Sequence, residues 1–148
     1  MIWFVGAGPG AEDLITVRGQ RLLMEADLVI YAGSLVNPEL LKCCKESCEI
    51  RNSAFMTLEQ VIDAMVQAEE DGKKIVRLHT GDPSLYGAIR EQMDLLDEKQ
   101  ITYQVCRGSV PLAERLQHCR QNIPCQTYPS RWLSPEWRDV HRFRRRNL

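Results

Sequence analysis

Apolar residues in the first two thirds of the chain alternate between two spacings, that of a strand and that of a helix. Short runs rich in Val, Ile, Leu and aromatic residues predict buried strands. The clearest runs are 2–5, 28–31, 48–50 and 74–78. Between them, apolar residues recur every three or four positions, which is the period of an amphipathic helix. The pattern predicts about five strands that alternate with about four helices.

One predicted helix has a well-marked beginning and end. Thr57 and Gln60 have the spacing of a capping box, and Gly72 follows the last apolar turn. A shorter helix is predicted over 38–45. Because strands and helices alternate, we expect an α/β fold with an open, mainly parallel five-stranded sheet flanked by helices. Ligands of such sheets bind beyond the carboxyl ends of the strands.

A glycine turn follows the predicted strand at 74–78 and opens into a helix. Asp82 stands at the N-cap position, and Pro83, at the first helical position, has its φ already fixed. Gly81 lets a bound molecule approach the backbone closely, and the helix start adds a partial positive charge. The residues that follow at helical spacing are Leu85, Ile89, Met93 and Leu96. This pattern is as typical of a plain structural turn as of a ligand-binding loop.

A second glycine loop follows the first predicted strand. Gly6, Gly8 and Ala11 fit the dinucleotide pattern G-x-G-x-x-[GA]. However, Pro9 and the glycine after it delay the helix, and Ala32 stands near the place where a ribose-binding carboxylate is expected. Both details argue against a dinucleotide site. In a parallel sheet, the two glycine loops lie at the same edge, where the strands end.

Together, the two glycine loops resemble the most characteristic segments of the tetrapyrrole methylases, which transfer methyl groups from S-adenosylmethionine to corrin precursors. These segments are G-A-G-P-G at 6–10, L-I-T-V-R-G at 14–19, T-G-D-P at 80–83 and Y-G at 86–87. Within the family, residues 31–38 and 78–87 are similar to the branch that methylates C11 of precorrin-4 or cobalt-precorrin-4. The resemblance covers residues 1–105 and implies the N-terminal domain of the family's fold.

The resemblance implies S-adenosylmethionine as cofactor, a corrin precursor (precorrin-4 or cobalt-precorrin-4) as substrate, and a homodimer. It places these residues at the cofactor: Gly8, Pro9, Gly10, Thr80, Gly81, Asp82 and Leu85. No catalytic base is predicted, because Ala32 stands where relatives that act on uroporphyrinogen carry an aspartate. His79 adjoins the turn, where it either contacts the corrin or cofactor or is a satisfied strand-end histidine. Tyr86 and Met93 fall on the apolar stripe of their helix, which favours a core position.

The cysteines indicate neither a disulfide framework nor a zinc site. Cys43, Cys44 and Cys48 lie on or after a predicted helix and lack the C-x-x-C spacing of a zinc ligand pair. Reduced thiols are the better interpretation. The sequence has no recognisable signal peptide and no apolar stretch long enough for a membrane span. We therefore expect a cytoplasmic protein that contacts no membrane and binds no metal.

The composition changes sharply after Val105. Residues 1–105 carry 17 acidic and 10 basic side chains, whereas residues 106–148 carry 3 acidic and 9 basic ones, all nine of them arginine. Four prolines interrupt the second segment, and no long apolar period crosses it. We therefore expect an N-terminal methylase domain at 1–105 and a poorly structured, arginine-rich tail at 106–148. No part of the given sequence is predicted to form the second domain of the family.

A frameshift near codon 105 is our hypothesis for the origin of the tail, and it implies an inactive or impaired enzyme. The family continues here with P-G-V-S-S and, later, A-L-x-x-E-Y-T-L-P. When the last base of each codon is read with the first two bases of the next, residues 105–110 are compatible with M-P-G-V-S and residues 118–125 with the later segment.

The alternative is a genuine basic tail that binds nucleic acid or a partner protein on a vestigial domain. Its candidate residues are Arg142, Arg144, Arg145 and Arg146, with Trp132, Trp137 and Phe143 nearby. Arginines neutralise phosphates and aromatic rings stack on bases, so this composition is compatible with such binding. The tail lacks lysine and any recognisable nucleic-acid module, and we rank this alternative second.

Overall fold

A parallel sheet of five short strands forms the centre of the computed structural model, which describes residues 1–33, 36–86 and 89–109. The strands are β1 (Ile2–Gly6), β2 (Leu28–Tyr31), β3 (Glu49–Asn52), β4 (Ile75–His79) and β5 (Tyr103–Cys106). Their order across the sheet is β3, β2, β4, β1, β5, and every neighbouring pair is parallel. The predicted open, parallel five-stranded sheet is confirmed.

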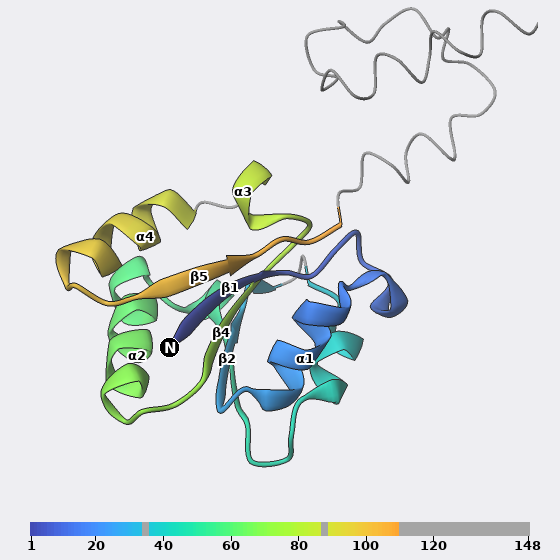
Figure 1. Cartoon of the computed structure of the whole chain (residues 1–148), viewed down its shortest axis with the longest axis horizontal. Helices are drawn as coiled ribbons and strands as arrows, with labels where there is room; N and C mark the ends of the chain where they lie inside the picture. The colour runs from blue at the N-terminus through green and yellow to red at the C-terminus, as the bar shows by residue number, and fades with distance from the viewer. Residues whose placement is uncertain (34–35, 87–88, 110–148) are drawn as a thin grey trace, which may run out of the picture. The chain divides into compact units, whose positions relative to one another are not determined.

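Helices cover both faces of this sheet. The α-helices are α1 (Val17–Glu25), α2 (Leu58–Glu70), α3 (Pro83–Tyr86) and α4 (Ile89–Glu98), and the 3-10 helices are η1 (Glu12–Leu14), η3 (Pro38–Cys43) and η4 (Ser53–Phe55). Figure 1 shows α1 on one side of the sheet, and α2 and α4 on the other. This arrangement follows from parallel strands, because each crossover must pass over a face of the sheet.

The sequence signals at the helix ends are confirmed. The Thr57 hydroxyl accepts a hydrogen bond from the Gln60 amide at 3.3 Å, and Gln60 Oε1 accepts one from the Thr57 amide at 3.0 Å. These two bonds form the predicted capping box of α2. Gly72 has φ +71°, the left-handed conformation that ends a helix and favours glycine.

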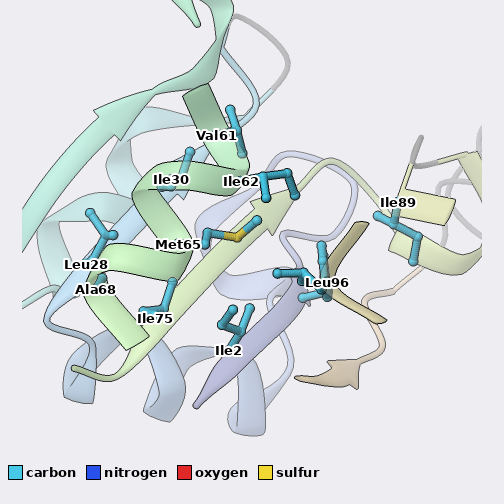
Figure 2. Packing of buried hydrophobic residues seen from close by; sticks show 11 residues of the cluster. Ile2, Leu28, Ile30, Val61, Ile62, Met65, Ala68, Ile75, Ile89 and Leu96 are labelled. Atoms are coloured by element: carbon cyan, nitrogen blue, oxygen red, sulfur yellow. The ribbon is translucent and has the colours of Figure 1, made fainter. Parts of the chain in front are cut away.

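One core cluster lies between the sheet and the pair α2 and α4. Alternate residues of β1, β2 and β4 face it, since side chains along a strand point to opposite sides. Figure 2 shows Ile2, Leu28, Ile30 and Ile75 of the strands directed towards Met65 and its neighbours on α2, with Leu96 of α4 beside them. Met93 packs against this cluster, so its predicted core position is confirmed.

The second core cluster lies on the opposite face of the sheet. Val5, Val29, Val76 and Leu78 alternate with the residues of the first cluster and pack with Leu23 of α1. Both faces of the central strands are therefore buried, which explains why their sequences are continuously apolar. Cys106, at the end of β5, is also buried in this cluster.

Several element boundaries differ from the prediction. The helix predicted over 38–45 is the 3-10 helix η3. Asn37 is its N-cap residue, and Asn37 Oδ1 accepts a hydrogen bond from the Glu39 amide at 3.0 Å. The helix after Asp82 is divided into α3 and α4. Strand β4 includes His79, one residue beyond the predicted end. The basic cluster at 142–146 and most of the predicted tail lie outside the described residues.

Candidate functional site

The two glycine loops meet at the carboxyl end of the sheet. The Gly8 amide donates to the Gly81 carbonyl at 3.2 Å, and the Gly81 amide donates to the Gly8 carbonyl at 3.0 Å. This pair forms an isolated antiparallel bridge beyond the parallel sheet. The Ala7 amide adds a bond to the His79 carbonyl at 2.7 Å. The structure therefore brings together two loops that the sequence separates by more than seventy residues.

A third backbone segment completes this junction. A Cβ atom added to Gly6 would lie 2.4 Å from the Gly81 carbonyl oxygen and 2.5 Å from the Gly108 amide nitrogen. A Cβ atom on Gly108 would lie 2.0 Å from that same carbonyl oxygen. Only glycine allows the three backbones to approach this closely. The carboxyl ends of β1, β4 and β5 therefore converge on one junction, which we call the glycine junction (Gly6, Gly81 and Gly108).

Two side-chain hydrogen bonds hold the loop after β1 over the glycine junction. Asn37 Nδ2 donates to the Gly10 carbonyl at 2.7 Å, which fastens the loop to the start of η3. The Ser109 hydroxyl donates to the Leu14 carbonyl at 2.7 Å, which fastens the loop to the segment after β5. No atom of the described residues lies within 4 Å of the position that a Cβ atom on Gly10 would take. The loop is thus held from both sides, while Gly10 borders open space.

Asp82 combines burial with a capping role. Its side chain is 5% exposed, and its Oδ1 accepts hydrogen bonds from the Ser84 amide at 2.8 Å and from the Ser84 hydroxyl. This is the predicted cap at the start of α3. Because Oδ1 makes these bonds, the carboxylate has a fixed position next to the Gly81 turn.

An arginine lies buried beneath this edge of the sheet. Arg77 of β4 is 6% exposed, and it donates to Gln92 Oε1 of α4 at 3.0 Å and to the Ile30 carbonyl of β2 at 3.1 Å. Burial lowers the pKa of Arg77 to about 10, so the guanidinium remains charged at neutral pH. The two hydrogen bonds connect α4 to the central strands.

His79 is the second buried polar group on the same face of β4. Its ring lies 6.0 Å from that of Phe4, between centroids, and its Nε2 is buried with no hydrogen-bond partner among the described residues. His79 therefore does not match the alternative of a strand-end histidine whose ring nitrogens both have hydrogen-bond partners in the described chain. Burial, with a smaller contribution from the charge of Arg77, lowers the pKa of His79 to about 3. The imidazole is neutral at physiological pH.

The predicted cofactor residues divide into three groups. Gly8 and Gly81 are in direct contact, and Asp82 lies next to them in sequence. Pro9 and Gly10 are half-buried in the loop that Asn37 holds, and Thr80 is half-buried at the end of β4. Leu85 belongs to α3, but its side chain, like that of Tyr86, lies outside the described part of the chain.

Sequence reasoning missed several contributors to this site. Gly108 and Ser109 fall in the segment that composition assigns to the tail, yet Gly108 packs against Gly6 and Gly81, and Ser109 bonds to the loop after β1. Asn37 and Arg77 act through partners that are distant in the sequence. The only local signal for any of these residues was Arg77 itself, a charged residue inside the apolar run at 74–78.

The cysteines of the described ranges carry no disulfide. Burial raises the pKa of the Cys44 thiol to about 12, and it also raises the pKa of the Cys43 and Cys48 thiols, which keeps all three protonated. Within residues 1–33, 36–86 and 89–109, no group of three or more His, Cys, Asp or Glu side chains is arranged to hold a metal ion. None of the helices in those ranges is long and apolar enough to cross a bilayer.

Residues 1–108 match the Tetrapyrrole (Corrin/Porphyrin) Methylases. The chain belongs to this family. It is 57% identical over 104 residues to the cobalt-precorrin-4 C(11)-methyltransferase of Methanocaldococcus jannaschii, covering 70% of this chain and 40% of that protein. The expected family membership is confirmed.

Two solved structures share the fold. The cobalt precorrin-4 methyltransferase CbiF is 41% identical with a TM-score of 0.76, and the match covers 83% of this chain and 52% of CbiF. The uroporphyrin-III C-methyltransferase of Thermus thermophilus, complexed with S-adenosylhomocysteine, is 27% identical with a TM-score of 0.63, over 75% of this chain and 46% of that one. The chain thus spans about half the length of these methylases.

The family match ends at residue 108, three residues beyond the predicted boundary at 105. Cys106, Gly108 and Ser109 make contacts within the N-terminal domain. The described part of the segment after residue 105 therefore packs with the methylase domain.

Proposed function

We propose that this chain supplies the N-terminal part of an S-adenosylmethionine-dependent methyltransferase that acts on C11 of precorrin-4 or cobalt-precorrin-4 in cobalamin biosynthesis. Membership of the tetrapyrrole methylases and the identity to the Methanocaldococcus protein support the reaction class and the substrate. The observation that carries the proposal is the reciprocal bonding of Gly8 and Gly81, which aligns both motif loops at the carboxyl end of the sheet.

The residues around the glycine junction fit a cationic nucleoside cofactor. S-adenosylmethionine carries a positive sulfonium, and the buried Asp82 carboxylate provides a fixed negative charge beside the turn. Gly10 borders open space, so a ligand can approach the backbone there without meeting a Cβ atom. The residues proposed to hold the cofactor are Gly8, Pro9, Gly10, Thr80, Gly81, Asp82 and Leu85.

The protein's part in this reaction is mainly positioning. S-adenosylmethionine, when bound, supplies an already activated methyl group. The glycine junction fixes the two loops against each other, so the ligand meets a rigid edge rather than two independent loops. Correct alignment and exclusion of water provide most of the acceleration in such transfers. We assign no catalytic base, and the buried, neutral His79 is not given that role.

The chain covers 40% of the Methanocaldococcus relative and 52% of CbiF. The impaired activity expected from the sequence, the homodimer and the cytoplasmic location stay predictions.

A complementation assay tests the proposed function. The chain is mixed with the part of the Methanocaldococcus relative that it does not cover, together with radiolabelled S-adenosylmethionine and enzymatically prepared cobalt-precorrin-4. We expect label in the tetrapyrrole only when both proteins are present. Gly81→Val should abolish this transfer, whereas Gly72→Val should retain it, because both glycines have positive φ (+62° and +71°) but only Gly81 lies at the site.

The proposal is wrong if the mixture is folded and associated but places no label on the tetrapyrrole. It is also wrong if Gly81→Val and Gly72→Val reduce transfer equally, because the effect would then come from backbone strain alone.

A further inference from the structure

Three cysteines lie together at the end of η3, and none of them is among the proposed cofactor residues. Cys43 is the last residue of η3, and Cys44 is its C-cap residue. Cys48 follows a tight turn, in which its amide donates to the Lys45 carbonyl at 2.9 Å. This turn brings the chain back towards the end of η3. All three side chains are half-buried and pack against the second core cluster.

The Cys44 thiol is the centre of this group. It interacts with the thiols of both Cys43 and Cys48, whereas each of those two interacts with Cys44 alone among the cysteines that the structure describes. Cys43 Sγ also donates to the Leu40 carbonyl at 2.9 Å, so this thiol is engaged within its own helix.

Of the two neighbours of Cys44, Cys48 is the better partner for a disulfide. The Cα atoms of two bridged cysteines are usually about 4.4–6.8 Å apart, whereas adjacent Cα atoms across a trans peptide are only about 3.8 Å apart. A bridge from Cys44 to Cys43 would therefore distort the backbone. A bridge from Cys44 to Cys48 spans a turn of three intervening residues and has no such restriction.

Exposure and charge decide which thiol reacts first. Cys44 and Cys48 are half-buried, whereas Cys106 is only 3% exposed, so a small oxidant reaches the group more easily than it reaches Cys106. Burial raises the pKa of the Cys48 thiol, but the Lys45 ammonium opposes this effect; burial raises the pKa of the Cys44 thiol to about 12. Because the thiolate is the form that attacks an oxidant, Cys48 is the more reactive of the two.

We propose that Cys44 and Cys48 form a reversible redox pair, which a peroxide converts to a disulfide. The Cys48 thiolate attacks one peroxide oxygen and becomes a sulfenic acid, while the departing hydroxide takes up the thiol proton and leaves as water. The Cys44 thiol then displaces the sulfenic hydroxyl as a second water, and the S–S bond forms. The two thiols together lose two electrons, which the peroxide gains. A dithiol reductant reverses the reaction by thiol–disulfide exchange. The inference does not depend on the proposed methyl transfer.

Peptide mapping of the full chain tests this inference. The reduced chain is exposed to hydrogen peroxide at about pH 8, where more thiolate is present than at neutral pH. Iodoacetamide then blocks the remaining thiols, and the chain is digested with trypsin without reductant. Trypsin cuts after Lys42, Lys45 and Arg51, so Cys44 and Cys48 fall in separate peptides, 43–45 and 46–51. A disulfide joins these two peptides, and mass spectrometry identifies the product.

Single variants identify the thiol that provides the bridge. We expect the linked peptides in the unmodified chain and in the matched control Cys43→Ala, and their loss in Cys44→Ala and Cys48→Ala. Dithiothreitol should remove the link. In urea, where the fold no longer selects a pair, Cys44→Ala should form the link through Cys43. Circular dichroism confirms that each variant is folded before oxidation.

Isotope mixing distinguishes a bridge within one chain from a bridge between two chains. Equal amounts of unlabelled and nitrogen-15-labelled chain are oxidised together, and we expect linked peptides that are either both labelled or both unlabelled.

Three results would overturn the inference. They are no link between 43–45 and 46–51 after peroxide treatment, equal yields of the link in folded Cys43→Ala and Cys44→Ala, and mixed-isotope links as frequent as uniform ones.

Discussion

Replacing Gly6 with alanine tests the glycine junction directly. The added Cβ atom would lie 2.4 Å from the Gly81 carbonyl oxygen and 2.5 Å from the Gly108 amide nitrogen, whereas ordinary contact begins at 3.4 Å. The shortfall is therefore about 1 Å on two sides. Both neighbours are backbone atoms, which cannot turn away as the end of a side chain can. The strands must separate, and this would weaken the paired bonds of Gly8 and Gly81.

We expect this substitution to destabilise the domain by about 3 kcal/mol, the upper end of the range for overpacking, because no side chain can relieve the clash. With a typical urea dependence of about 2 kcal/mol per M, the unfolding midpoint would fall by about 1.5 M. Urea titration followed by far-ultraviolet circular dichroism measures this shift.

Two other glycines provide controls. Gly72→Ala adds a Cβ atom that no described residue approaches within 4 Å, but at φ +71°, and should cost about 1–2 kcal/mol through backbone strain. Gly19→Ala meets only side-chain atoms at 3.1–3.2 Å and improves helix propensity, so its effect should stay within about 1 kcal/mol. If Gly6→Ala is no more harmful than Gly72→Ala, the close approach of the three backbones does not exist.

Three further predictions follow from single residues and from the gene. Folding lowers the pKa of His79 from its ordinary value of 6.5 to about 3. Between about pH 6.5 and pH 3, His79 is therefore protonated in the unfolded chain only, and the free energy of unfolding falls as the pH falls. When the pH falls from about 7 to about 5, the free energy of unfolding measured by urea titration should fall by about 2 kcal/mol more for the unmodified chain than for His79→Gln. Equal losses would refute burial of the neutral ring. Thr57→Ala should cost about 1 kcal/mol in the same assay, with a smaller loss for Gln60→Ala, and a neutral Thr57→Ala would show that the capping box contributes nothing. Finally, sequencing the gene through the codons for 105–148 should reveal methylase-like sequence in the offset frame, and its absence there would rule out the frameshift.

Local signals were sufficient for most of the elements. Continuous apolar runs located the central strands because both faces of these strands are buried. The capping box located the start of α2 because its two bonds connect residues only three apart. The division of the helix after Asp82 into α3 and α4 was not predictable, because one apolar stripe continues from Leu85 to Leu96 across both helices.

The candidate site was predictable only in part. The resemblance named both glycine loops, and the parallel topology implied that they lie at one edge, which the bridge of Gly8 and Gly81 confirms. The role of Gly108 could not be inferred, because its contacts are with residues far away in the sequence. The arginine-rich composition of 106–148 also led us to assign Gly108 to the tail. Composition is an average over the whole segment, so it cannot identify the role of one glycine near its start.

The central claim is that the paired glycine loops hold the cofactor. An NMR titration with S-adenosylhomocysteine, the product that the cofactor leaves after methyl transfer, tests this claim most directly. The isotope-labelled chain is titrated with S-adenosylhomocysteine, and the amide NMR shifts are followed, which detects weak binding as well as tight binding. We predict that the largest shifts occur at the amides of Gly8, Gly10, Gly81 and Asp82, with none at Gly72 beyond the end of α2. Shifts confined to other parts of the chain, or no shifts at millimolar ligand, would contradict the proposal that the paired glycine loops hold the cofactor.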